Sequence, residues 1–302
     1  MTSAPPIPAW LRSKMAELGP RWREDIPGHV KQMLDAFASI LAEAPKAGVA
    51  VERDIAYGGH PRQQLDLFAP ADTRMAKPAV LFVHGGAFVA GHRNFNAEVY
   101  ANVLYYFARH GIVGINMGYR LADDSPYPAA TQDVGAVMGW TRAHAAALGI
   151  DPRRIFLMGH SAGGAHIASY AYDKRPHPPE GPGIAGLIVL SGRVRVDNLP
   201  ENPNARKVEA YYGTDASRFE DYSPVSHVDA GSVPTFIAMA QYENPLLDVY
   251  SLELAQRLAV AKRRAPPLVW LRGHNHASLV AHLNTAEDDL GSAIRAFIEQ
   301  PS

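Results

Sequence analysis

Residues 155–164 read Ile-Phe-Leu-Met-Gly-His-Ser-Ala-Gly-Gly, an apolar run followed at once by a glycine-rich turn. The run Ile155–Met158 predicts a strand that is buried on both faces. The next five residues match G-x-S-x-G, and the small and apolar residues Ala162–Tyr172 predict a helix after the turn. Glycines at both ends of the motif suit a turn too tight for side chains, which would leave Ser161 pointing outward. A strand, a tight turn and a helix in this order indicate a βα unit with a candidate nucleophile at its turn.

The rest of the chain repeats this alternation of short apolar runs and longer helical stretches. The predicted core strands are Ala79–Val83, Ile112–Met117, Ile155–Met158, Ile184–Leu190, Thr235–Ala240 and Leu268–Leu271, with Gln64–Phe68 as an antiparallel edge strand. The predicted helices are Ala97–His110, Ala129–Leu148, Ala162–Tyr172, Leu247–Arg264 and Thr285–Glu299. This order predicts an α/β protein with a doubly wound, mostly parallel sheet and right-handed crossovers.

Two segments stand outside the alternation. Residues 1–50 contain two stretches with helical spacing, Trp10–Leu18 and His29–Glu43, whereas residues 51–302 hold all the predicted strands. Within the second part, residues 192–233 form a long, polar, turn-rich insertion between two core strands. We take residues 1–50 and the insertion as candidates for a helical cap over a catalytic domain that spans residues 51–302.

The composition of the 302 residues excludes several classes of protein. Apolar residues make up 47% and charged residues 20%, with a net charge of -1, so no basic surface favours nucleic acid. No apolar run approaches the roughly 20 residues that cross a bilayer, and the first residues do not resemble a secretory signal. The absence of cysteine excludes disulfides, thiolate catalysis and cysteine-bound metals, and makes the cytoplasm the default location.

A second motif, His84-Gly85-Gly86-Ala87-Phe88, follows directly after the strand Ala79–Val83. Acyl transfer needs hydrogen-bond donors aimed at the oxyanion of the tetrahedral intermediate, and backbone N–H groups are already fixed in place. Adjacent glycines let the backbone approach a substrate closely. The alternative is a plain turn, but the G-x-S-x-G motif downstream favours an oxyanion loop, in which His84 braces the loop instead of acting as the base.

A serine nucleophile also needs an imidazole base and an acid that orients it. In chain order the acid is expected after Ser161 and the histidine last. Gly273-His274-Asn275-His276 follows the last predicted strand and offers two candidate bases, with His282 further on. Glu243 and Asp248 follow the strand Thr235–Ala240 and are the candidate acids.

Three motifs together resemble the hormone-sensitive-lipase-like branch of the α/β-hydrolases. They are HGGAF at 84–88, YRLA at 119–122 with PYPAA at 126–130 and Asp133-Val134, and GHSAGG at 159–164, with Asp123-Asp124 where that branch has Pro-Glu. The resemblance implies a carboxylesterase that acts on small esters without metal or cofactor. It also implies that the amides of Gly86, Ala87 and Ala162 are the oxyanion donors.

The same resemblance helps to choose the base and the acid. The loop GHNH-x-S resembles that of arylformamidase-like hydrolases, whose second histidine is the base, which favours His276 over His274. The usual acid loop of the family, E-Y-D-P-L-x-D, aligns its first Asp with Glu243 or with Asn244, depending on the end from which residues are counted. Only Glu243 can carry the required charge, and Asp248 is interpreted as a helix cap or surface charge. His282 is expected on a surface helix.

The substrate pocket is predicted from sequence position alone. Phe88, after the glycines of the first motif, Tyr119, after the next predicted strand, and His160 are the candidates for contacting the substrate. The alternative for such aromatic residues is ordinary packing in the core or the cap, which is the more common case. Arg193 and Arg195 are candidates for meeting a substrate carboxylate, with a solvated rim as the favoured interpretation. A small-molecule ester is the expected partner, and a homodimer is left open. The alternatives are an arylformamidase-like amidase and a non-catalytic ligand-binding protein, comparable to the plant gibberellin receptor; the histidines that remain in the loop argue against the latter.

Overall fold

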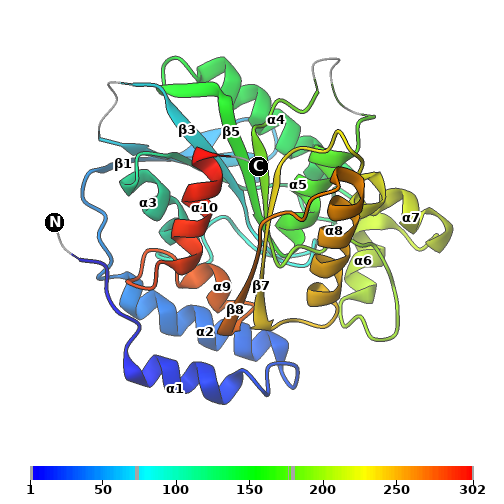
Figure 1. The fold of residues 1–302 in the computed structure, drawn as a ribbon, viewed down its shortest axis with the longest axis horizontal. Helices are drawn as coiled ribbons and strands as arrows, with labels where there is room; N and C mark the ends of the chain where they lie inside the picture. Colours follow the sequence, from blue (N-terminus) through cyan, green and yellow to red (C-terminus); the bar gives the residue numbers. More distant parts are fainter. Residues whose placement is uncertain (1–2, 72–74, 176, 178–180, 301–302) are drawn as a thin grey trace.

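The strand–helix alternation folds into one eight-stranded sheet, drawn in Figure 1 from a computed structural model that describes residues 3–71, 75–175, 177 and 181–300. The strands lie in the order β1-β2-β4-β3-β5-β6-β7-β8. From β4 and β3 through β8 all neighbours pair in parallel. The strands are β1 Val49–Ala56, β2 Gln64–Pro70, β3 Lys77–Val83, β4 Val113–Met117, β5 Ile150–His160, β6 Gly186–Leu190, β7 Thr235–Tyr242 and β8 Leu268–Asn275. The predicted mostly parallel α/β fold is confirmed.

The prediction that Gln64–Phe68 forms an edge strand is wrong. β2 is antiparallel as expected, but it pairs with β4 on one side and with β1 on the other. β1 takes the edge, and most of its residues are exposed or half-buried. Its polar stretch Glu52-Arg53-Asp54 lacks the apolar pattern that marks a strand in sequence, because a strand at the sheet edge buries little side-chain surface.

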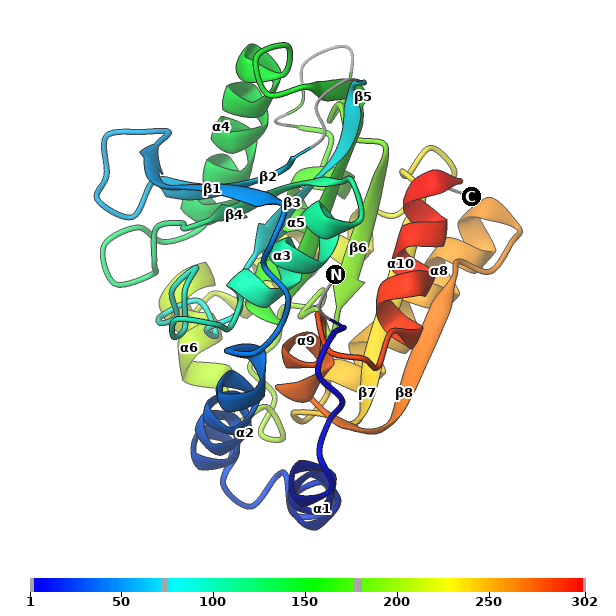
Figure 2. The same ribbon diagram turned by 90° about the vertical axis from the view of Figure 1, so that its left-hand side faces the viewer.

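Helices cover both faces of the sheet (Figures 1 and 2). Alternate residues of one strand belong to opposite layers: Val80 and Phe82 of β3 pack in one hydrophobic cluster, and Leu81 and Val83 in the other. The first cluster includes side chains of α3 and α10, and the second those of α4, α5 and α8. These helices are α3 Ala101–Arg109, α4 Ala129–His144, α5 Ala162–Tyr172, α8 Leu247–Lys262 and α10 Asp289–Glu299. Strands buried from both sides explain the continuous apolar runs.

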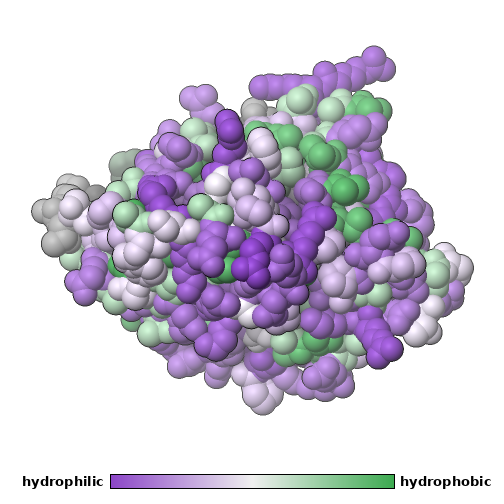
Figure 3. Space-filling model, turned by 90° about the horizontal axis from the view of Figure 1, so that it is seen from below, coloured by the Kyte–Doolittle hydropathy of each residue, from purple (hydrophilic) through white to green (hydrophobic). Residues whose placement is uncertain are grey.

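The remaining α-helices are α1 Ala9–Leu18, α2 Ile26–Leu41, α6 Ala205–Tyr212, α7 Phe219–Tyr222 and α9 Ser278–Ala281. α1, α2, α6 and α9 lie toward the end of the sheet where β7 and β8 finish, whereas α7 lies to the side, beyond α8 (Figure 1). α2 begins at an Asp25 cap whose carboxylate accepts a 3.1 Å hydrogen bond from the Gly28 amide. The face seen from this end is largely hydrophilic, with scattered hydrophobic residues (Figure 3). Across the described ranges, every helix is too short or too polar to cross a membrane.

Candidate active site

Ser161 occupies a strained turn between β5 and α5. Its backbone has φ 57° and ψ -119°, and α5 begins at the next residue. A Cβ at Gly159 would stand 2.5 Å from the carbonyl oxygen of Gly163, and one at Gly163 would stand 2.1 Å from that of Val83. Both positions therefore require glycine. The turn is held by a 3.0 Å hydrogen bond from the Ser161 amide to the Leu190 carbonyl, so packing against β6 maintains the unfavourable φ.

His276 and Glu243 form a buried pair beside this turn. The distance from His276 Nδ1 to Glu243 Oε2 is 2.7 Å, and the two residues are 4% and 2% exposed. A nitrogen that faces a carboxylate at this distance carries the proton, which leaves Nε2 as the lone-pair acceptor. His276 and Ser161 line the same cavity. The preferred base and the preferred acid are therefore brought together at the candidate nucleophile.

The carboxylate of Glu243 is fixed by donors on its other oxygen. Oε1 accepts a 2.8 Å hydrogen bond from the Ala240 amide and a second from the Ser191 hydroxyl. Sequence reasoning missed Ser191, which directly follows β6 and is fully buried with φ 46°. Its position immediately after a predicted core strand could have indicated a place in the site, because the carboxyl ends of parallel strands meet at one edge of the sheet. These bonds aim Oε2 at the imidazole.

The glycine-rich loop that follows β3 forms another part of the cavity wall at Ser161. Gly86 has φ 146°, and a Cβ there would stand 1.9 Å from the carbonyl oxygen of Ala90. Ala87 follows with φ 51°, a value that L residues adopt rarely. Gly86, Ala87 and Ala162 all line the cavity that holds Ser161. Ala162 is the first residue of α5, so its N–H has no acceptor within the helix and is free to bind an anion.

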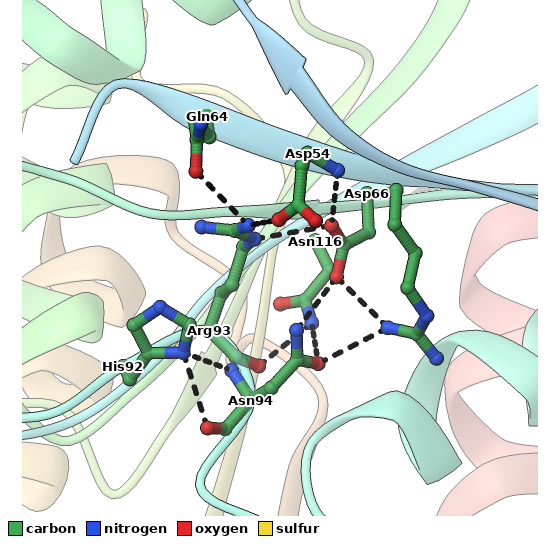
Figure 4. A network of polar contacts seen from close by, with 8 residues as sticks. Asp54, Gln64, Asp66, His92, Arg93, Asn94 and Asn116 are labelled. Atoms are coloured by element: carbon green, nitrogen blue, oxygen red, sulfur yellow. Dashed lines mark hydrogen bonds and ion pairs between the residues drawn. The ribbon is translucent and has the colours of Figure 1, made fainter. Parts of the chain in front are cut away.

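A polar network anchors the far end of this loop to the sheet (Figure 4). Arg93, 3% exposed, donates from Nε to Asp66 of β2 at 3.1 Å and also pairs with Asp54. The Arg93 carbonyl accepts a 2.7 Å hydrogen bond from Asn116 of β4. Burial would raise the pKa of Asp66, but the Asp54 amide, the Asn94 side chain and Arg93 outweigh it and hold the pKa below its usual value. The charged carboxylate of Asp66 on β2 thus accepts hydrogen bonds from the loop and from the Asp54 amide, and so links the loop to β2 and β1.

The structure corrects the expectation that Phe88 and Tyr119 contact the substrate. Phe88 is 1% exposed and stacks on Tyr211 of α6, and Tyr119 is fully buried and donates to the carbonyl of His84 at 3.0 Å. Among the described residues that line the cavity, neither appears. Both lie behind the oxyanion loop and support it. His84 braces the loop as predicted: its Nδ1 bonds the Gly85 carbonyl at 2.7 Å, and burial lowers its pKa to about 3.

His160 lines the cavity, and it also contacts the loop of the candidate base. Its Nε2 donates to the backbone carbonyl of His276 at 3.0 Å, and the two rings lie 4.5 Å apart. Burial holds the pKa of His160 well below its usual value. A neutral His160 therefore connects the turn at Ser161 to the base loop.

The alternative base and acid have other partners. His274 is buried, and its two nitrogens lie 3.1 Å from Ser278 Oγ and 2.7 Å from Glu287 Oε1. The Asp248 side chain is 41% exposed, lies 3.7 Å from Arg23 and accepts a hydrogen bond from the amide that follows it. The expectation that His282 is a surface residue is wrong, since it is fully buried and burial lowers its pKa to about 4.

The cavity at Ser161 has a volume of about 280 Å³. α2 contributes apolar side chains, among them Val30 and Leu34, and the 192–233 insertion contributes Arg193, Asn204 and Lys207. Arg193 was expected on a solvated rim, but it is 4% exposed. A larger open hollow of about 770 Å³, lined by α4, α5 and α7, contains neither Ser161 nor His276. The smaller cavity therefore holds the candidate chemistry.

Comparison with solved structures identifies the fold. A bacterial heroin esterase superposes with a TM-score of 0.71 at 24% identity, covering 92% of this chain and 93% of its own. The protein has the α/β-hydrolase fold. A truncated carbohydrate esterase from gut microbiota also matches this α/β-hydrolase, with a TM-score of 0.72 at 17% identity over 85% of this chain and all of its own.

Sequence comparisons match parts of this chain to esterases. The BD-FAE family model matches residues 65–175, which include the glycine-rich loop after β3 and Ser161. A probable isoprenylcysteine alpha-carbonyl methylesterase, ICMEL2 of Arabidopsis thaliana, is 36% identical over 160 residues, 50% of this chain and 37% of its own length. Esterase LipI of Mycobacterium tuberculosis (strain ATCC 25618 / H37Rv) is 30% identical over 192 residues, 57% of each chain. The chain thus spans about a third to a little over half of these relatives. The resemblance to esterases of the hormone-sensitive-lipase-like type is confirmed.

Proposed function

We propose that the protein is a serine carboxylesterase that hydrolyses small carboxylic esters. The observation that carries this proposal is the buried 2.7 Å pair of His276 and Glu243, which leaves Nε2 of the imidazole free in the cavity of Ser161. The esterase names of the relatives support the choice of bond. Ser161 Oγ attacks the ester carbonyl while Nε2 takes its proton, and Glu243 stabilises the imidazolium that forms.

The charge of the tetrahedral intermediate falls on the former carbonyl oxygen. The amides of Gly86, Ala87 and Ala162 are the proposed donors to this oxyanion, and the positive end of α5 adds to them. The imidazolium then passes its proton to the leaving alcohol, and an acyl group remains on Ser161. Water, deprotonated by His276, releases the acid and restores the enzyme. No step needs a metal or a cofactor.

We further propose that residues 1–50, through α2, and the 192–233 insertion act as the cap over this site. The support is that residues 26–34 and residues 193–207 line the same cavity as Ser161. Apolar side chains of α2 would then surround the uncharged part of an ester, since a partly apolar wall is typical of small-molecule sites. The cap is tested by replacing Val30 with Trp, which is expected to exclude longer acyl chains while short acetyl esters are still cleaved.

The proposed function is tested by labelling and turnover together. A fluorophosphonate is expected to modify Ser161 stoichiometrically, as read by peptide mass spectrometry, and the Ser161→Ala variant is expected to lose p-nitrophenyl acetate hydrolysis by several orders of magnitude in kcat.

An N-formyl arylamine tests the amidase alternative. In the GHNH-x-S loop, Ser278 Oγ and Asn275 Oδ1 exchange 2.9 Å hydrogen bonds with each other's amides, which accounts for this motif by loop structure alone. Ligand binding without labelling or turnover would favour the non-catalytic alternative.

Two coarser features of the protein follow as proposals. β8 is the last strand of the sheet, and Leu268 and Trp270 on it are 42% and 52% exposed, so we propose this open edge as the face of a homodimer. Light scattering after size-exclusion chromatography tests it, with Trp270→Glu expected to give a monomer.

A cytoplasmic location, proposed from the lack of cysteine, is tested by cell fractionation.

A further inference from the structure

Arg193 is a buried cation at the wall of the cavity. It is 4% exposed and lines the same cavity as Ser161. Its backbone amide donates to the carbonyl oxygen of Ser161 at 3.1 Å, so its segment is tied to the turn that holds the candidate nucleophile. Its guanidinium carbon lies 5.4 Å from the centre of the Tyr250 ring, a cation–π arrangement that holds the side chain in place.

This guanidinium lacks an acidic partner in the described part of the chain. Nη1 is buried without a hydrogen-bond acceptor, and no carboxylate of the described residues lies within 4.0 Å of the side-chain nitrogens. Arg195, two residues later, differs: it pairs with both Glu220 and Glu253. The carboxylate of Asp197 accepts hydrogen bonds from Tyr250 and Asn202. Burying an unpaired cation is costly, so an arginine kept in this state indicates an anion that arrives from outside.

Among the residues that line the cavity directly, the other charged side chain has the same sign. Lys207 of α6 lines it as a second cation, whereas no Asp or Glu is among its lining residues in the described chain. The two lining histidines are His160, whose pKa burial lowers, and the candidate base His276. The one carboxylate beside the wall, Glu243, is paired with His276, and a cleft whose directly lining charges are cationic attracts anions. Its volume of about 280 Å³ restricts such an anion to a small molecule.

We propose that the preferred substrates are small esters that carry a free carboxylate, which Arg193 binds while Ser161 attacks the ester group. A singly charged carboxylate matches one buried guanidinium in charge and in planar geometry. This inference extends the proposed esterase function to a substrate class. The carboxylate can stand on the acyl side, as in monomethyl succinate, or on the alcohol side, as in O-acetylglycolate, and matched substrates distinguish the two.

The test compares each anionic ester with its uncharged amide counterpart, methyl succinamate or O-acetylglycolamide, in a pH-stat assay. For at least one pair, kcat/KM is expected to favour the carboxylate about 10- to 100-fold, the range of a hydrogen bond to a charged group. Arg193→Gln is expected to abolish that ratio. Arg195→Gln is the matched control and is expected to keep it, because Arg195 has its own carboxylate partners. Equal kcat/KM within both pairs of the unmodified enzyme, or an unchanged ratio in Arg193→Gln, would overturn the inference.

Binding separates this inference from the esterase proposal and from misfolding. By calorimetry, the Ser161→Ala variant is expected to bind monomethyl succinate or O-acetylglycolate at least about tenfold more tightly than the amide counterpart. The double variant with Arg193→Gln is expected to lose this difference, and Arg193→Lys to regain part of it. If fluorophosphonate labelling and turnover fail but the binding difference is found, the esterase proposal falls and the anion site stands. Equal binding of acid and amide refutes the anion site.

Discussion

Replacing Glu243 with Gln tests the assignment of the acid most directly. The change removes one negative charge from beside His276 and keeps the length of the side chain. The carboxylate lies 2.7 Å from Nδ1 and is 2% exposed, so solvent screens it little. Opposite charges with centres about 4 Å apart attract by about 4 kcal/mol at an effective dielectric constant near 20. This attraction exists only while the imidazole is protonated, which is the state formed during attack.

The loss therefore falls on the transition state. At about 1.4 kcal/mol for each factor of ten, kcat of Glu243→Gln is expected to drop about 1,000-fold with little change in KM. Initial rates with p-nitrophenyl acetate measure it. Asp248→Asn is the control: its half-exposed carboxylate lies 3.7 Å from Arg23, and kcat is expected to stay within about twofold.

Two results would refute this reasoning. If Glu243→Gln kept more than about a tenth of kcat, the charge beside His276 would not be what stabilises the imidazolium. If Asp248→Asn lost more activity than Glu243→Gln, the acid would have to be reassigned. Circular dichroism and fluorophosphonate labelling of both variants show whether the fold and the serine turn are intact.

Three further variants probe the residues around the site. Ser191→Ala removes a hydroxyl donor to the buried acid, and kcat is expected to fall about tenfold, measured with the same ester. His274→Gln breaks the 2.7 Å contact with Glu287, so the free energy of unfolding is expected to fall by about 1–3 kcal/mol while kcat is kept, which urea denaturation and ester turnover measure. Because the pKa of Asp66 is lower in the folded state than in the unfolded state, its contribution to stability is present above about pH 4 and is lost as the pH falls through the folded value. The difference in urea midpoint between the parent and Asp66→Asn is therefore expected to be largest at pH 7 and to shrink at pH 3.

The fold and the local motifs could be predicted because each depends on a pattern of consecutive residues. An apolar run buried on both faces and a turn that needs glycine at 159 and 163 each leave a local pattern. β1 left none, because its side chains are mostly exposed. The prediction that His282 is exposed was wrong because its burial depends on how the short helix α9 packs, and sequence spacing does not reveal that packing.

Parts of the site that depend on distant contacts could not be predicted. Arg193 was expected in solvent because arginine usually is, and only the packing of Tyr250 and the cavity wall places it inside. Phe88 and Tyr119 adjoin motif residues, but a residue next to a motif can point to the opposite side of the backbone. Both lie in an aromatic layer behind the oxyanion loop, with His84, His166 and Tyr211.

The alignment of the acid loop left open whether Glu243 or Asn244 stands at the position of the acid. In the structure these two adjacent side chains have different partners. Glu243 turns to His276, while Asn244 accepts a 2.8 Å hydrogen bond from the indole of Trp22.

The segment between α1 and α2 contacts the loop that carries Glu243 and Asn244, and the helix that follows it, α2, lines the cavity. Trp22 is 1% exposed and donates to Asn244, and Arg23 donates to the backbone carbonyl of Glu243 at 3.4 Å. A buried hydrogen bond contributes only when both partners are present, and losing Trp22 would leave the Asn244 oxygen unpaired beside the acid. Residues 3–50 thus do two things that a separable lid would not: they line the cavity and they hold the backbone of Glu243 and Asn244. The position of the proposed acid, and with it the orientation of the proposed base, depends on a segment that the strand pattern places outside the catalytic fold.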